Sequence, residues 1–296
     1  MDTLSIHTFV AVTESRSFSK AADVLYLTQP AVSKRIAALE EILGFRLFDR
    51  IGKKIILTEA GKELYPRAKR ILLELEDSRR AINNLSGNVT GRLSFGTSHH
   101  IGLHRLPPIL SAYSKVYPQV ELDIQFLGSE TACDAVEHGN LEMALITMPN
   151  IQKSNLLQTH IWDDPLQVVI GKGHPLAAET KHSKAPLTPL TLAGHPAILP
   201  GSGTFTRDII DSDFLKQGVS LTVKISTNYL ETIKMLVTVG LGWSILPESM
   251  INAEELISLD VEGIRPRRSL GVIRHSARTL SNAGRAMIDM LGEEGV

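Results

Sequence analysis

The sequence lacks the features that mark secreted and membrane proteins. It contains one cysteine, Cys133, so no internal disulfide can form, and its setting is that of a packed helix residue rather than a reactive thiol. No apolar run approaches the roughly 18 residues that a membrane-spanning helix needs. The first residues also lack the basic-then-apolar order of a secretion signal. We therefore expect a globular protein in the cytoplasm, with no membrane partner.

Motifs of the common enzyme classes are missing as well. Gly201-Ser-Gly is not the Gly-x-Ser-x-Gly turn of hydrolases, and neither a His-Glu-x-x-His motif nor a phosphate-binding loop occurs. His99, His100 and His104 invite a metal hypothesis, but spacings of one and five residues do not place three imidazoles around one tetrahedral ion. We expect a protein that is not an enzyme, with no catalytic residues, no metal ligands and no cofactor.

Net charge is also close to zero, because 31 Lys and Arg residues are balanced by 32 Asp and Glu residues. The distribution is uneven, however. Between residues 16 and 54, eight basic residues stand against four acidic ones. A basic segment of this kind is typical of one module that meets nucleic-acid phosphates while the rest of the chain has another task.

The segment from Ser17 to Glu40 predicts two short helices joined by a tight turn. In the second helix the apolar residues recur at helical spacing and form one stripe for burial: Val32, Ile36, Leu39 and Leu43. Thr28 is placed to cap this helix, and Pro30 lies in its first turn. The opposite face is small, polar and basic, and carries Pro30, Ser33 and Lys34, with Gln29 and Arg35 on its flanks. Such a helix start fits the major groove of DNA, and an ordinary helical hairpin is the alternative.

Two short strands around Gly52 are predicted directly after these helices, from Arg46 to Leu57. The tip of this hairpin, or wing, presents Arg50, Lys53 and Lys54, which could reach phosphates or the minor groove; a solvated turn is the alternative. Together with a first helix over residues 4–14, the pattern predicts a winged helix-turn-helix domain over residues 1–57.

A long helix follows over residues 58–87, with Thr58 as its cap. Its apolar positions alternate between spacings of four and three residues, which is the seam of a coiled coil: Leu64, Ala68, Ile71, Leu75, Ser78, Ile82 and Leu85. A second copy of the chain is the expected cover for this seam, so we predict a homodimer. The alternative is that the helix packs on the downstream domain of its own chain.

Residues 88–296 alternate between strand and helix patterns, which predicts a parallel α/β fold. Strands are expected at 93–96, 120–127, 143–148, 166–170, 197–199, 221–226, 243–246 and 269–274, and helices at 103–117, 130–138, 204–217, 229–239 and 280–291. The last strand and helix have no local partner and are expected to return to the first half. We therefore predict two lobes around a cleft, lobe I at about 92–162 and 267–296 and lobe II at about 163–266.

Over nearly its whole length the chain resembles the LysR-type transcriptional regulators. The most specific motifs are Phe18-Ser-Lys-Ala-Ala, Thr28-Gln-Pro-Ala-Val-Ser, Ile36-Ala-Ala-Leu-Glu-Glu, Leu47-Phe-Asp-Arg and Leu57-Thr-Glu-Ala-Gly. The resemblance implies a winged helix-turn-helix domain, a dimerisation helix and a two-lobed effector domain like a periplasmic binding protein, usually assembled as a homotetramer. It assigns DNA contacts to Gln29, Pro30, Ser33, Lys34, Arg35, Arg50 and Lys53.

The same resemblance places a small effector in the interlobe cleft, in contact with loops at strand-to-helix transitions. Helix starts at these loops suit an anion, because their free N–H groups carry partial positive charge. The implied effector contacts are Ser98, His99, His100, Ser129, Thr147, Gly201, Ser202, Gly203, Thr204 and Thr227. His99 and His100 replace the small hydroxyl residue that relatives often carry, so the effector of a relative does not transfer simply to this chain.

These observations predict a DNA-binding transcriptional regulator that recognises an inverted-repeat promoter site in double-stranded DNA and responds to a small, anionic effector. RNA polymerase is a further candidate partner. Two rival interpretations stay open at this point. One is a small-molecule binding protein of the transport class, and the other is an enzyme with a cleft active site and an autoregulatory DNA-binding segment.

Overall fold

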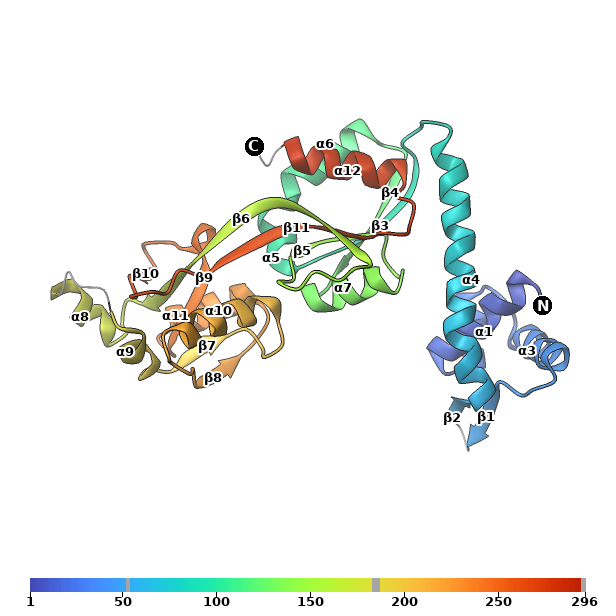
Figure 1. The fold of residues 1–296 in the computed structure, drawn as a ribbon, viewed down its shortest axis with the longest axis horizontal. Helices are drawn as coiled ribbons and strands as arrows, with labels where there is room; N and C mark the ends of the chain where they lie inside the picture. Colours follow the sequence, from blue (N-terminus) through green and yellow to red (C-terminus); the bar gives the residue numbers. More distant parts are fainter. Residues whose placement is uncertain (52–53, 183–186, 294–296) are drawn as a thin grey trace. The chain divides into compact units, whose positions relative to one another are not determined.

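The computed structural model describes residues 1–51, 54–182 and 187–293, and the chain divides into two compact units, Met1–Ser86 and Gly87–Val296 (Figure 1). The first unit has one hydrophobic core of its own. The second has several cores that cover both faces of a sheet. Among the described residues, no helix is long and apolar enough to cross a membrane.

The first unit, here called the helix-turn-helix unit, consists of helices and one short hairpin. In chain order its elements are α1 (Thr3–Ser15), α2 (Phe18–Val24), α3 (Gln29–Leu43), β1 (Phe48–Ile51), β2 (Lys54–Leu57) and α4 (Glu59–Asn84). Asp2 and Ser17 cap the first two helices, because their side chains accept hydrogen bonds from the backbone N–H groups of Ser5 and Lys20. The local sequence therefore determines where these helices start.

The predicted stripe on α3 is buried in the core of this unit, where Val32, Ile36 and Leu39 lose nearly all their exposure. Gly44 ends the helix in the left-handed conformation, at φ 72°, which glycine adopts without strain. The carboxylate of Glu40 then accepts a hydrogen bond of 2.6 Å from the backbone N–H of Leu47. This bond ties the chain entering the β1–β2 hairpin to α3, so the recognition helix and the wing are held on one core.

Helix α4 is the long cyan helix of Figure 1 and carries Pro66 within its first turns. The prediction that its seam has no cover within its own chain was wrong for the first half. Ala68 and Leu72 are buried in the core of the same unit, and Leu64 packs against it. Only the later seam positions remain exposed, namely Ile71, Leu75, Ser78, Ile82 and Leu85. A helix of 26 residues reaches beyond the small three-helix core, so its end protrudes.

The second unit, here called the effector-binding unit, is built on one sheet of nine strands. Eight of them follow the order β4-β3-β5-β11-β6-β9-β7-β8, and the ninth, β10, pairs with β6. The strands are β3 (Gly91–Thr97), β4 (Val120–Phe126), β5 (Met143–Thr147), β6 (Leu156–Gly171), β7 (Ala197–Leu199), β8 (Val223–Ser226), β9 (Trp243–Pro247), β10 (Leu256–Leu259) and β11 (Arg267–His275). The helices are α5 (His99–His104), α6 (Leu106–Val116), α7 (Ser129–Glu137), α8 (Leu176–His182), α9 (Pro189–Ala193), α10 (Phe205–Lys216), α11 (Leu230–Thr238), the 3₁₀ turn η1 (Glu248–Met250) and α12 (Asn282–Glu293).

Strands β6 and β11 run side by side and antiparallel between two lobes (Figure 1). The first part of β6 pairs with β11, and from Leu166 onward β6 pairs with β9 and β10 in the second lobe. The prediction of two lobes crossed twice by the chain is confirmed, and α12 returns to pack on α6 and β3 of the first lobe. The expected parallel pairing holds within each lobe but not for the strands that cross between the lobes. The strands β3, β4 and β5 pair in parallel, as do β7, β8 and β9, but both crossing strands pair antiparallel with their neighbours.

Two element boundaries also differ from the sequence prediction. The helix expected over residues 103–117 is interrupted at Arg105. Pro107 and Pro108 lie in the first turn of a new helix, so the segment forms two helices. The strand expected over residues 166–170 is the 16-residue β6. The first part of this strand is hard to recognise in the sequence, because it contains the polar residues Asp163 and Asp164 and is followed by Pro165. Proline is rare inside strands, and Pro165 lies where β6 changes its pairing partner.

Candidate functional site

The first candidate site is the start of α3, where the residues predicted to contact DNA lie together. Gln29, Pro30 and Lys34 are exposed, and Ser33 and Arg35 are half-buried. The side-chain amide of Gln29 donates a hydrogen bond of 2.8 Å to the hydroxyl of Ser33. These two side chains therefore already share a defined arrangement one turn apart on the exposed face.

Thr28 occupies the N-cap position of α3 as predicted, but its side chain makes no capping hydrogen bond. The helix start instead depends on Pro30 in the first turn. The predicted wing contact Lys53 lies outside the described residues. Arg50 lies in β1, and its side chain also lies outside the part of the chain that is described.

The second candidate site is a cavity of about 290 Å³ between the two lobes of the effector-binding unit. It is bounded by the start of α5, the end of β4, the start of α7 and the end of β5 from one lobe. The other lobe contributes the starts of α10 and α11. The lining residues are Ser98, His99, His100, Phe126, Leu127, Gly128, Ser129, Glu130, Thr147, Pro200, Thr204, Thr206, Asn228, Tyr229, Leu230 and Arg268. This is the edge of an α/β sheet where ligands usually bind.

Of the ten predicted effector residues, six line this cavity: Ser98, His99, His100, Ser129, Thr147 and Thr204. The other four, Gly201, Ser202, Gly203 and Thr227, are not among the lining residues. The hydroxyls of Ser98 and Thr204 cap α5 and α10, since they accept hydrogen bonds from the N–H groups of Ile101 and Arg207. Gly203 has a φ of 81°, so it forms the turn that brings Thr204 to the cavity. As contacts to an effector, all ten residues stay predictions.

The sequence prediction missed Arg268, which lines the cavity from the crossing strand β11. Its side chain is almost fully buried, and its Nε donates a hydrogen bond of 2.9 Å to Asp164 Oδ2. Its Nη1 lies 3.3 Å from the hydroxyl of Thr206. A charged residue next to the apolar run Leu270 to Ile273 is the signal that could have identified it, because a buried cation needs a partner.

Several contacts join the two lobes around the cavity. The carboxylate of Glu130 on α7 accepts a hydrogen bond of 2.5 Å from the backbone N–H of Phe205, at the start of α10. The ring of His99 lies 4.9 Å from the ring of Tyr229 in the other lobe and 5.5 Å from that of Phe126. An internal carboxylate thus occupies a helix N-terminus of the second lobe, which is the kind of position that binds anions.

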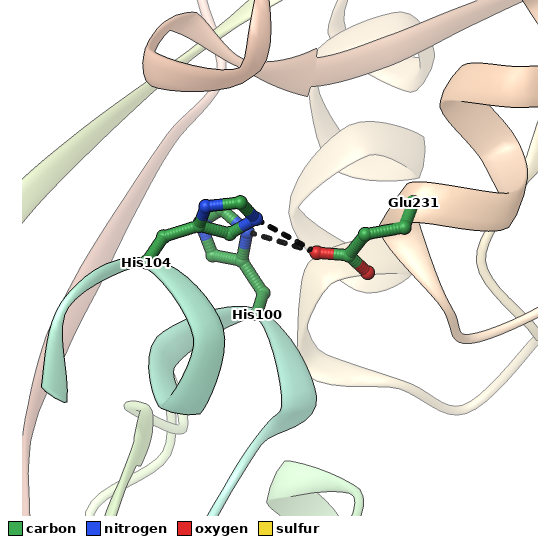
Figure 2. Close-up of side chains that lie close together, drawn as sticks. All are labelled: His100, His104 and Glu231. Carbon is green, nitrogen blue, oxygen red and sulfur yellow. Dashed lines mark hydrogen bonds and ion pairs between the residues drawn. The ribbon is translucent and has the colours of Figure 1, made fainter. Parts of the chain in front are cut away.

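Figure 2 shows a second interlobe group, His100 and His104 from α5 facing Glu231 from α11. His104 Nε2 lies 3.0 Å and His100 Nδ1 lies 3.9 Å from Glu231 Oε1. Burial lowers the pKa of His100 to about 3, and the nearby Arg268 guanidinium acts in the same direction. The His100 imidazole is therefore neutral at pH 7. His99 points elsewhere, so the three histidines of the sequence motif do not form one group.

Cys133 lies buried on α7, in a small core between that helix and the sheet. Burial raises the pKa of its thiol, so the reactive thiolate is suppressed at neutral pH. The interpretation of Cys133 as a packing residue agrees with this environment.

Comparison with known proteins identifies the family of each of the two units. Residues 4–62 match the family model described as bacterial regulatory helix-turn-helix protein, lysR family, and residues 86–295 match the LysR substrate binding domain. A probable RuBisCO transcriptional regulator of Thalassiosira pseudonana is 33% identical over 276 residues, which cover 90% of this chain and 88% of that protein. The chain therefore belongs to the LysR family of transcriptional regulators, which are not enzymes.

Two solved structures share the fold. One is the full-length CbnR in complex with its target DNA, with a TM-score of 0.66, 18% identity and coverage of 100% of both chains. The other is the regulatory domain of Synechocystis CcmR in complex with 2-PG, with a TM-score of 0.61, 22% identity and coverage of 70% of this chain and 98% of that one. The rival interpretations as a transport-class binding protein or an enzyme are disfavoured, and the protein is a DNA-binding transcriptional regulator with an effector-binding domain.

Proposed function

We propose that this regulator responds to a small anionic effector that binds in the interlobe cavity. The observation that supports this proposal is the buried guanidinium of Arg268, which lines the cavity together with several hydroxyl-bearing residues. Ser98, Ser129, Thr147 and Thr206 supply those hydroxyls. A guanidinium can bind a carboxylate or a phosphate with two parallel hydrogen bonds. CcmR, a fold relative, holds 2-PG in its regulatory domain, which is consistent with this choice of chemistry.

The effector would act by changing how the two lobes close. Residues from both lobes line the cavity, and only a ligand that binds one arrangement more tightly than another can shift the balance between them. An anion that competes with Glu130 for the N-terminus of α10 would break one interlobe hydrogen bond. The anion would then accept the hydrogen bond from the backbone N–H of Phe205 in place of Glu130. The resulting change would alter the relative positions of the DNA-binding dimers in an assembly.

On DNA, the start of α3 would enter the major groove and the wing would contact the backbone beside it. Gln29, Ser33 and Lys34 are proposed to discriminate bases, with Pro30 setting the helix start. Arg35, Arg50 and Lys53 are proposed to contact phosphates. Two such units related by a two-fold axis would match an inverted-repeat promoter site. The module would work in the cytoplasm, with RNA polymerase as a further partner.

The exposed end of α4 is proposed to pair with a second copy, and a dimer of such dimers would form the homotetramer. Ile82→Glu places a charge in the exposed seam and should weaken dimerisation, because the charge would be buried against the partner helix. Asn83→Glu is the matched control, since it adds the same charge one residue away on another face of the helix. Sedimentation velocity over a concentration series distinguishes the two variants, and equal dimerisation would contradict the proposal.

The effector proposal is tested by thermal-shift screening of the full-length protein with small carboxylates and phosphates, followed by DNA binding in their presence. A stabilising anion should lose affinity in Arg268→Lys, which keeps the charge beside Asp164 but loses the forked geometry. Arg274→Lys is the control on the same strand, because Arg274 does not line the cavity. If every stabilising anion binds both variants equally, the cavity assignment is wrong.

A further inference from the structure

We infer that His100, His104 and Glu231 form a binding site for a divalent transition-metal ion such as Zn²⁺, located between the lobes at the edge of the cavity. Each residue offers one ligand atom, and these atoms all lie within 4.8 Å of one another. Nothing in the proposed response to an organic anion requires this ion, so the site extends that function.

The geometry of the group suits metal coordination. His100 and His104 are four residues apart on α5, so their imidazoles lie on the same face of the helix, with ring centroids 4.9 Å apart. Glu231 approaches them from α11 (Figure 2). Bonds of 2.0–2.2 Å in a tetrahedral site place ligand atoms about 3.3 Å apart. The carboxylate-to-imidazole distances of 3.0 and 3.9 Å bracket this value, so small side-chain movements would complete the site.

A second observation points to a missing ligand. His100 is only 4% exposed, yet neither of its ring nitrogens has a hydrogen-bond partner among the residues that the structure describes. Buried polar atoms are nearly always satisfied, and leaving one unpaired costs roughly 1–3 kcal/mol. Nδ1 of this ring faces the carboxylate of Glu231 at 3.9 Å, which is too far for a hydrogen bond. A metal ion between the two atoms would give this nitrogen the partner that it lacks.

The charges around the site permit a cation despite two nearby arginines. Arg268 and Arg105 both lie within ion-pair distance of the buried carboxylate of Asp164. Glu231 contributes the second negative charge beside the histidines. Two guanidinium groups are therefore matched by two carboxylates, and the entering ion would not meet an uncompensated positive field.

The donor set indicates which ions can bind. Two imidazoles and one carboxylate suit Zn²⁺, Co²⁺ or Ni²⁺, whereas Mg²⁺ and Ca²⁺ prefer oxygen ligands alone. Three protein ligands leave a coordination position open, as in sites where zinc also binds water or another molecule. His100 lines the cavity, so an anion held there is within reach of that position. Because the histidines and Glu231 come from different lobes, the ion would hold α5 and α11 together.

The site is tested on full-length, untagged protein from which metals have been removed with a chelator. Zn²⁺ titration by calorimetry should give one site per chain, and Co²⁺ should give the intense visible bands of four-coordinate cobalt. His104→Gln and Glu231→Gln each remove one partly exposed ligand and should weaken binding by at least about tenfold. Mg²⁺ should not compete.

His160→Gln is the matched control, since His160 lies 3.0 Å from Asp163 in an isolated histidine–carboxylate pair. It should bind zinc like the wild type. The inference is overturned if the wild-type chain binds no stoichiometric zinc, or if both ligand variants bind zinc as tightly as the control. Circular dichroism confirms that each variant is folded.

The outcome is separable from that of the proposed function. Zinc binding that depends on His104 and Glu231, in a protein that responds to no anion, would support the metal site and reject the anionic effector. An anion response in metal-free protein without any zinc binding would do the reverse.

Discussion

In the helix-turn-helix unit the candidate DNA contacts on α3 come from one 15-residue helix and lie at its surface, whereas the effector-binding unit draws its cavity from segments between Ser98 and Arg268. The first arrangement follows from helical periodicity alone. The second depends on two strands, β6 and β11, that bring distant loops together. A site on one helix tolerates changes elsewhere, and a site between lobes depends on every element that positions them.

The largest expected effect concerns the buried charge of the effector-binding unit. Asp164→Ala should cost about 3–5 kcal/mol of that unit's free energy of unfolding, because it leaves the Arg268 guanidinium buried without its partner. Urea unfolding followed by tryptophan fluorescence measures this directly, since Trp162 and Trp243 both lie in the effector-binding unit. Asp123→Ala, which disrupts the more exposed pair with Arg92, is the control and should cost at most about 1 kcal/mol. Equal losses would contradict the prediction.

A substitution in the helix-turn-helix unit tests whether the two units unfold independently. Leu39→Ala removes a fully buried side chain from the helix-turn-helix core and should cost about 2–5 kcal/mol. Because this unit contains no tryptophan, far-UV circular dichroism should show an earlier transition while the fluorescence transition stays in place. The control Ala38→Ser, at an exposed position of the same helix, should stay within about 0.5 kcal/mol. A fluorescence transition that moves with Leu39→Ala would show that the units unfold together.

DNA binding should separate base discrimination from phosphate contact. Ser33→Ala should reduce the preference for the specific site by about 1–3 kcal/mol, whereas Lys53→Ala should weaken all duplexes alike and reduce the salt slope by about one. Titrations against specific and scrambled duplexes over a salt series measure both quantities. Gln29→Ala combined with Ser33→Ala should be non-additive, because the two side chains are hydrogen-bonded. If neither single variant shows its expected effect, the assignment of roles to Ser33 and Lys53 is wrong.

The smallest effect expected is a pH dependence from His174, in the effector-binding unit. Burial lowers its pKa from the ordinary 6.5, and the neighbouring His195 adds to this while Glu179 opposes it. Between the lowered pKa and 6.5 the unfolded chain binds more protons than the folded one, so stability falls as pH drops below about 6.5. His174→Asn keeps an acceptor for the backbone N–H of Leu176 and should reduce this acid loss. Urea midpoints at pH 7.5 and 5.5, read by fluorescence, check the change; an unaltered pH difference would contradict it.

Much of the fold could be predicted from the sequence. The buried stripe of α3, the left-handed stop at Gly44 and the long capped α4 all follow from local periodicity and turn chemistry. The mixed sheet could not be predicted in the same way. The first part of β6 reads as polar, and its strand state depends on pairing with β11, which begins about one hundred residues later. Non-local pairing of this kind overrides local propensity.

The candidate sites divide along the same line. The residues proposed to contact DNA at the start of α3 can be grouped from the sequence, because their spacing places them on one helix face. Arg268 and Glu231 were missed. A charge beside a buried apolar run was the only local signal for Arg268, and the segment around Glu231 carries no such signal. The sequence motif suggests a set of three histidines, whereas the structure turns His99 away and pairs His100 with His104, four residues apart.

By itself, the sequence determined the helix-turn-helix unit and the exposed face of its α3 helix. A helix assigns its faces through a repeat of 3.6 residues, which is visible in any short segment. Only the tertiary structure decided which residues meet between the lobes. Arg268 reaches its partner Asp164, and the histidines of α5 reach Glu231, through contacts that join residues about one hundred positions or more apart. Those neighbours are set by chain crossing and burial, which no local pattern encodes.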